Sequence, residues 1–251
     1  MDFDLISYSI LFGAGFLAGV INVVSGGGST LTLPSLLFLG LDAPTSNGTN
    51  RIGIFIQTLT AIREFRKHPD FDLRLSFKMS MATVPGALIG SFYSIGLGDE
   101  EFRIVLGSVL FVILILLFSP NASKVYDESD RKTELTIWHW LGLVLLGVYG
   151  GFIQVGIGFF LMLFLNKALK MNLVEVNIHK VFIVMIYTIP ALLVFGFSGY
   201  LTIIPGIVLS IGTILGSMLS AKFAIRKGAK FVKYILVFSL IIVIFKLFEV
   251  F

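Results

Sequence analysis

Residue types that are absent or scarce in this 251-residue chain exclude several classes of protein and of binding site. It contains no cysteine, which excludes a disulfide framework, thiolate metal sites and any mechanism that passes a substrate along thiols. Charged residues make up only 14% of the chain, whereas 56% are apolar and gather in blocks rather than amphipathic stripes. The formal net charge of +4 does not indicate nucleic acid, because here the placement of the charges matters more than their sum. The composition predicts a polytopic integral membrane protein with no nucleic-acid partner.

Sequence patterns of common hydrolases and nucleotide-binding proteins are missing as well. No H-E-x-x-H, G-x-S-x-G or P-loop pattern occurs, and carboxylates inside the apolar blocks are too few for a protease dyad. The acidic runs 99–101 and 127–130 lack the spacing of metal ligands. We therefore expect no enzyme, no cofactor and no bound metal.

Apolar blocks long enough to cross a bilayer recur along the chain. A transmembrane helix needs about 20 apolar residues. The first block follows only Asp2 and Asp4, without the basic flank of a cleaved signal peptide, so we expect it to be a mature span. Two blocks, 29–40 and 158–170, have about 12 residues, roughly 18 Å of helix, and are predicted to be broken or re-entrant helices. Eight full spans are predicted near 5–24, 45–62, 76–96, 102–118, 137–155, 175–196, 200–221 and 231–248.

The basic residues predict the orientation. They gather around 66–75, within 119–136 and around 222–233, which places these three connections in the cytoplasm. The connections 97–101 and 196–200 contain no basic residue and are predicted to lie outside. This arrangement requires both short segments to cross the membrane, since a re-entrant second segment would move a strongly basic connection outside. The chain then has five segments plus five, with both termini outside the plasma membrane.

Because five is odd, the second set of segments begins on the opposite side from the first, as in inverted-topology repeats. Glycines four residues apart also serve close packing of membrane helices, and that explains any single pair. We predict an all-α polytopic fold with two such repeats, residues 1–118 and 137–251, joined by a cytoplasmic linker, 119–136. Matching residues recur at spacings of 132 (Gly15, Gly19 and Asn22 with Gly147, Gly151 and Gln154), 129 (Asn50 and Arg51 with His179 and Lys180) and 126 (Gly86 and Gly90 with Gly212 and Gly216).

Glycine-rich breaks interrupt the apolar sequence at matching places in the two halves. Residues 25–30 read SGGGST, and residues 156–158 read GIG. Glycine lets the backbone leave helical geometry and approach a ligand, while a helix that begins there presents N–H groups and its positive dipole end. The breaks therefore predict an anion site. The hydroxyls of Ser25, Ser29 and Thr30 either add donors to it or cap the following helix.

A basic residue follows each break at membrane depth, Arg51 in the first half and Lys180 in the second. A bound anion is a natural partner for a charge there; the alternative is that both side chains extend to an interface. His179 either couples proton movement to anion movement or has satisfied hydrogen bonds. The predicted substrate-binding residues are Ser25, Gly26, Gly27, Gly28, Ser29, Thr30, Asn47, Thr49, Asn50, Arg51, Gln57, Gln154, Gly156, Gly158, Asn177, His179, Lys180 and Tyr187.

Four first-half motifs resemble the signature of one family. Segments 15–19, 25–30, 33–37 and 48–51 read GFLAG, SGGGST, LPSLL and GTNR, and they are similar to the sulfite exporter TauE/SafE family. The resemblance covers nearly the whole chain, although the second half lacks the triple glycine. It implies a permease of two related halves that exports sulfite, sulfonates or related small organic anions across the plasma membrane.

We expect a secondary transporter that exports its anion by alternating access, with the lipid bilayer and a small anion as its partners. Protons as a coupling ion and a second copy of the chain are left open as further partners. Two alternatives fit the same sequence: an anion channel of this architecture and a membrane scaffold without transport.

Overall fold

The computed structural model describes residues 4–25, 27–69, 71–117, 134–218, 241 and 243–244. In this part of the chain all regular structure is helical, which confirms the all-α prediction. Gly26, residues 119–133 of the predicted linker and most of the predicted span 231–248 lie outside it. The helices are α1 (Leu5–Ser25), α2 (Ser29–Phe38), α3 (Ala43–Phe65), α4 (Leu73–Ile95), α5 (Asp99–Leu117), α6 (Ile137–Phe152), α7 (Ile157–Ala168), α8 (Leu173–Phe197) and the helix Ile203–Met218.

Local backbone geometry sets where the second-half helices end and begin. The predicted span 137–155 ends early, at Phe152, because Gln154 (φ 58°) and Gly156 (φ 69°) adopt left-handed conformations that no α-helix continues. The short helix α7 follows at once. Asn172 then caps α8 by accepting from two N–H groups of its first turn, while the Glu175 carboxylate accepts from the Asn172 N–H in return.

The two short helices lie at the predicted positions, with 10 residues in α2 and 12 in α7. By length and composition alone, two of the described helices are long and apolar enough to cross a membrane: Leu5–Asn22 within α1, and Leu173–Phe197. The helices α3 to α5 are also 19 residues or longer. Charged and polar side chains interrupt the apolar sequence of α3 and α4, and four charged residues stand in the first five positions of α5.

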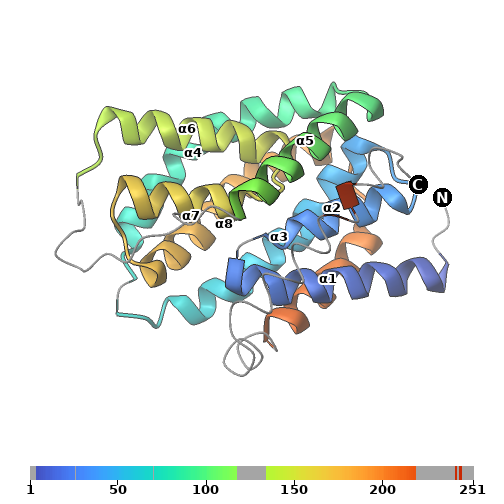
Figure 1. Ribbon diagram of the computed structural model, residues 1–251, viewed down its shortest axis with the longest axis horizontal. Coiled ribbons are helices and arrows are strands. Elements are labelled where there is room, and N and C mark those ends of the chain that lie inside the picture. Colours follow the sequence, from blue (N-terminus) through green and yellow to red (C-terminus); the bar gives the residue numbers. More distant parts are fainter. Residues whose placement is uncertain are drawn as a thin grey trace.

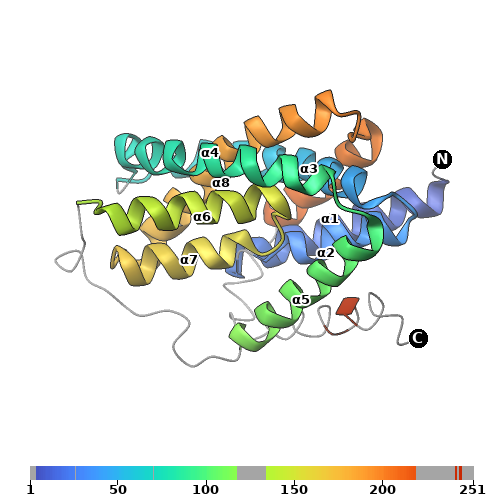
Figure 2. The ribbon, with the colours of Figure 1, turned by 90° about the horizontal axis from the view of Figure 1, so that it is seen from above.

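The helices lie side by side along the long axis of the molecule (Figure 1). In that view α6 runs along the top left and α1 along the bottom, α4 rises behind α6 toward the top right, and α3 and α8 lie between them. Figure 2 shows the same bundle from above, with α5 inclined to its neighbours. Helix α4 packs most extensively on α6 and α8, and α3 on α8. One apolar core cluster joins α4, α6, α7 and α8, and another joins α1, α2, α5 and α7.

Glycines let two pairs of helices pack backbone to backbone. A Cβ added to Gly19 of α1 would overlap the carbonyl oxygen of Thr213 in the helix Ile203–Met218. The same overlap would arise between Gly151 of α6 and Ala87 of α4. The glycine pairs that recur at spacings of 132 and 126 thus meet each other, the pair on α1 with Gly212 and Gly216, and the pair on α6 with Gly86 and Gly90.

We expect Gly19→Ala to lower the free energy of unfolding by about 1–3 kcal/mol, because the added methyl group must push two backbones apart. Gly13 lies on the same helix with nothing within 4 Å of an added Cβ. Gly13→Ala should therefore be neutral, or stabilising by up to about 1 kcal/mol through helix propensity. Thermal unfolding of the purified protein in detergent measures both. Equal shifts in the two variants would contradict the packing argument.

Candidate functional site

The two helix breaks meet in the interior, joined by one hydroxyl group. Ser29 is the first residue of α2, and its Oγ accepts from the Gly156 N–H at 3.1 Å. The same Oγ lies 3.4 Å from the Gln154 carbonyl oxygen, to which it donates. A hydroxyl group of the first half thus satisfies backbone groups that the break between α6 and α7 leaves outside the helical pattern.

A pocket of about 40 Å³ lies against this junction, beside a larger cavity of about 500 Å³. The two spaces share Asn22 of α1, Thr58 of α3, and Lys180 and Val181 of α8. The inner pocket is further lined by Ser29, Ile54, Gln154, Ile157, Gly158 and Val184. The outer cavity is further lined by Gln57, Thr60, Ala61, Phe65, Val174, Asn177, Ser217 and Met218.

The larger cavity reaches the surface at one end of the bundle. Val174 and Met218 line its mouth and are 46% and 65% exposed. Phe65 lies there too, so the mouth is formed by the last turn of α3, the first turn of α8 and residues near Met218. The basic residues around this end of the helices predict that it faces the cytoplasm.

Lys180 lines both spaces and is only 5% exposed. Its Nζ donates a 2.6 Å hydrogen bond to Oδ1 of Asn177, one turn earlier on α8. No carboxylate of the described residues lies within ion-pair distance of this ammonium group. A buried ammonium group has three donors and is costly without a counter-charge, so the site favours an anion beside Nζ.

The remaining polar wall of the pocket is held in place by side-chain hydrogen bonds. Asn22 donates to Oε1 of Gln57 at 2.9 Å, which links α1 to α3. Gln154 donates to Oγ1 of Thr188 at 2.9 Å and to the hydroxyl of Tyr187 at 3.5 Å. Its own Oε1 is buried without a hydrogen-bond partner. These contacts fix the side chains of the break against α8.

Arg51 occupies a different environment from Lys180. It is fully buried, and its guanidinium group donates to the carbonyl oxygens of Gly150 (3.0 Å) and Gly151 at the end of α6. A third contact joins it to Oδ1 of Asn47 at 3.4 Å, and the Phe195 ring lies 4.8 Å from Cζ. Arg51 does not extend to an interface, which was the alternative for its side chain.

Two backbone N–H groups at the first break already have hydrogen-bond acceptors within the protein, although the sequence predicts that they face an anion. The N–H of Thr30 donates to the Gly27 carbonyl and that of Leu31 to Gly28, both at 3.1 Å. The hydroxyl of Thr30 also donates to Gly27, at 2.6 Å, so it bonds back to its own backbone. Among the described residues that line the pocket, Lys180 supplies the one cationic side chain, and Ser29 and Gly158 bring the first turns of α2 and α7 to the same wall.

The other predicted site residues form contacts between helices. Thr49 accepts from the Thr202 N–H at 3.0 Å, and Asn50 accepts from Thr32 at 2.5 Å. Nδ1 of His179 lies 2.7 Å from the Ser76 hydroxyl. Gly28 packs closely on α1, Ser25 is described only by its backbone, and Gly26 lies outside the described residues.

Thr58 and Asn22 also line the site, although neither is among the site residues predicted from the sequence. Thr58 lies on the α3 face that also carries Ala61 and Phe65, three and seven residues later. Asn22 matches Gln154 at the spacing of 132. Thr58 could have been found by helical spacing from the predicted polar residues of the same helix. Asn22 could have been found from its repeat match to Gln154.

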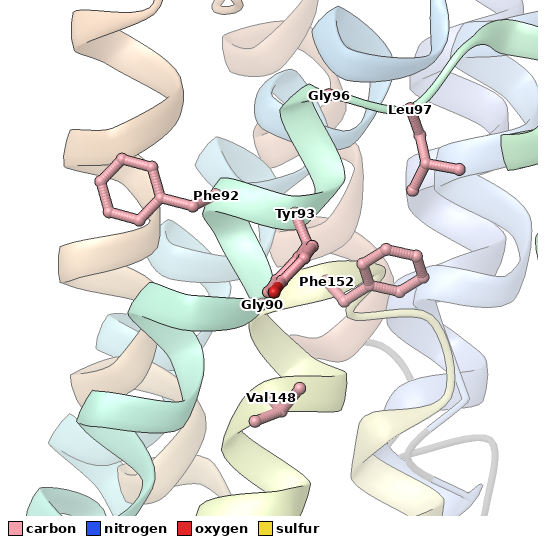
Figure 3. Close-up of a pocket in the computed structure, with 7 residues that line it drawn as sticks. All are labelled: Gly90, Phe92, Tyr93, Gly96, Leu97, Val148 and Phe152. Carbon is pink, nitrogen blue, oxygen red and sulfur yellow. The ribbon is translucent and has the colours of Figure 1, made fainter.

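A second groove lies between the C-terminal ends of α4 and α6. Figure 3 shows it lined by apolar side chains, with Tyr93 and Phe152 beside Gly90 and Val148, and Phe92 pointing away. It contains no charged residue and none of the predicted site residues. The candidate site is therefore the cavity around Lys180.

Known proteins resemble the chain along most of its length. A probable membrane transporter protein (ORF9) of a Sinorhizobium species is 26% identical over 94% of this chain and 90% of its own length. A probable membrane transporter protein of Haemophilus influenzae is 29% identical over 93% and 91%, and YfcA, a probable membrane transporter protein of Escherichia coli K12, is 26% identical over 91% and 84%. No solved structure matches the chain. The model of the family described as sulfite exporter TauE/SafE matches residues 11–247, so the chain belongs to this family and is a membrane transporter rather than an enzyme.

Proposed function

We propose that this protein is a secondary transporter that moves a small, singly charged organic or sulfur oxyanion across the plasma membrane. The observation that carries the proposal is Lys180, a buried cation that lines the pocket at the helix breaks and has an amide as its hydrogen-bond partner. Asn177, Gln57, Thr58 and Ser29 supply neutral hydrogen-bonding groups around it. The family description, sulfite exporter, supports an oxyanion as the substrate and the outward direction.

The charge of the pocket favours a monoanion over a dianion. Lys180 is the one cationic side chain among the described residues that line the two spaces. Lys180 balances one negative charge, so a second charge on the anion would have to be compensated by neutral hydrogen-bond donors alone. Hydrogen sulfite and organic sulfonates carry one charge, whereas sulfate carries two.

The shape of the cavity supports alternating access rather than an open channel. The larger cavity reaches the surface at the predicted cytoplasmic end, and the small pocket at the breaks lies on its inner side. Beyond the breaks, α3 is joined to α6 by the contacts of Arg51 and Asn47. An exporter that faces the cytoplasm would load its substrate in this state.

Inverted-topology repeats are part of the proposal, and the glycine contacts support them. The pair Gly15 and Gly19 packs on Gly212 and Gly216. The residues that match these two pairs by spacing, Gly147 and Gly151 on α6 and Gly86 and Gly90 on α4, pack on each other in the same way. Equivalent helices thus cross in equivalent ways. Such repeats can exchange their conformations, which opens one end of the bundle as the other closes.

Lys180→Gln should affect anion binding without lowering the stability of the anion-free protein. We expect the melting temperature of the anion-free variant to equal or exceed that of the native protein, because the substitution removes a buried charge that lacks a counter-charge. Hydrogen sulfite or methanesulfonate should stabilise the native protein, by about 2.7 kcal/mol at one hundred times its dissociation constant, and leave the variant unchanged. Lys167→Gln, at an exposed position of α7, is the matched control. Equal anion stabilisation of all three proteins would contradict binding at Lys180.

Flux into proteoliposomes tests transport itself. Native protein should carry hydrogen sulfite and methanesulfonate with saturable kinetics and discriminate against sulfate. Lys180→Gln should lose about ten-fold or more in kcat/KM, chiefly by raising KM, because it removes a binding contact. Lys167→Gln should behave as the native protein does. Flux that rises linearly with millimolar substrate would favour a channel, and anion flux that Lys180→Gln leaves intact would refute the assigned site.

A further inference from the structure

The guanidinium group of Arg51 binds the end of a broken helix in the opposite half of the chain. Helix α6 ends at Phe152, inside the bundle, and its last carbonyl groups have no partner in the helix. Arg51 reaches them from α3 with two donors, one to Gly150 and one to Gly151. Asn47, one turn earlier, donates to the Phe152 carbonyl at 2.6 Å. Three successive carbonyl groups of α6 are therefore bound by two side chains of α3.

This contact suits a positive charge. The carbonyl end of a helix is the negative end of its dipole, and burial away from water strengthens the attraction. The flat guanidinium group presents parallel donors to two neighbouring carbonyls, which a lysine ammonium group cannot match in geometry. Phe195 of α8 covers the charge from the other side. These contacts leave Nε as the Arg51 donor without a partner.

We propose that Arg51 holds the outer end of the transporter closed while the cavity faces the cytoplasm, and that it acts as a positioning residue rather than a substrate ligand. The proposal rests on the alternating-access function above. Arg51 lines neither the inner pocket nor the larger cavity, whereas Lys180 lines both. The two cations that match by sequence spacing thus divide two tasks: Lys180 binds the anion, and Arg51 fixes α3 to α6. Opening the outer end requires Arg51 to release the α6 carbonyls.

The contact also includes α4, which gives a position for a reporter. Ser91 is fully buried on α4, and its hydroxyl lies 2.7 Å from the Ala87 carbonyl and 3.2 Å from the Gly151 carbonyl, the same oxygen that Arg51 binds. Separation of α3 from α6 would bring water to this point. Thr60 lines the larger cavity and reports on the other end. Because the chain contains no cysteine, a single cysteine at either position is the one thiol present.

The test is the rate at which a water-soluble maleimide labels Ser91→Cys and Thr60→Cys in lipid nanodiscs, with no substrate added. In the native background we expect Thr60→Cys to react quickly and Ser91→Cys slowly. Adding Arg51→Gln should raise the Ser91→Cys rate about ten-fold or more and slow Thr60→Cys, because loss of the contact shifts the population toward the outward-open state. Lys180→Gln changes the same charge but touches no α6 carbonyl, so it should not raise the Ser91→Cys rate.

Two outcomes overturn the proposal: an unchanged Ser91→Cys rate in folded Arg51→Gln, or an equal rise in Lys180→Gln. If Arg51→Gln does not elute as a folded protein, Asn47→Ala decides, since it removes the neighbouring contact to Phe152 and should raise the Ser91→Cys rate by a smaller factor. In flux assays Arg51→Gln should lower kcat more than it changes KM, the reverse of Lys180→Gln. Labelling needs no anion, so an error in the proposed substrate leaves this test intact.

Discussion

Backbone that leaves helical geometry inside a membrane protein must find hydrogen-bond partners within the protein, and this constraint organises the bundle. The break between α6 and α7 exposes carbonyl and N–H groups near the centre. Ser29 of the first half binds the N–H side, at Gly156, and Arg51 binds the carbonyl side, at Gly150 and Gly151. The second-half break is therefore completed by side chains of the first half, which ties the two halves together where a substrate would pass.

The same constraint separates the two buried cations. Arg51 has carbonyl groups of α6 and an aromatic ring around it, so its charge is compensated by the protein. Lys180 has one amide oxygen as its partner and faces the pocket, and under the proposed function the anion that enters supplies its counter-charge. A transporter needs both kinds of contact: one that holds a conformation in the absence of substrate, and one that substrate completes.

The order and positions of the helices could be predicted from apolar block length and glycine placement, and the two short helices lie where the sequence put them. The early end of α6 could not be predicted from the sequence, because residues other than glycine that adopt a left-handed conformation, such as Gln154, have no comparable sequence signature. Sequence spacing paired Arg51 with Lys180 and suggested one role for both. Helix packing decides that Arg51 contacts backbone carbonyls and that Lys180 lines a cavity. The spacing of residues along the sequence does not distinguish these two environments. The sequence also did not predict that the Thr30 and Leu31 N–H groups donate to Gly27 and Gly28, because these hydrogen bonds depend on the conformation of the turn before α2.

The central claim is that the transported anion binds beside Lys180 between α3 and α8. An experimental structure of the protein in lipid, determined with bromomethanesulfonate, tests this most directly, because bromine marks the position of a singly charged sulfonate by its anomalous scattering. The account predicts sulfonate density within hydrogen-bonding distance of Lys180 Nζ, with the Arg51 contacts to α6 intact. Sulfonate density against Arg51, with the pocket at Lys180 left empty, would contradict it.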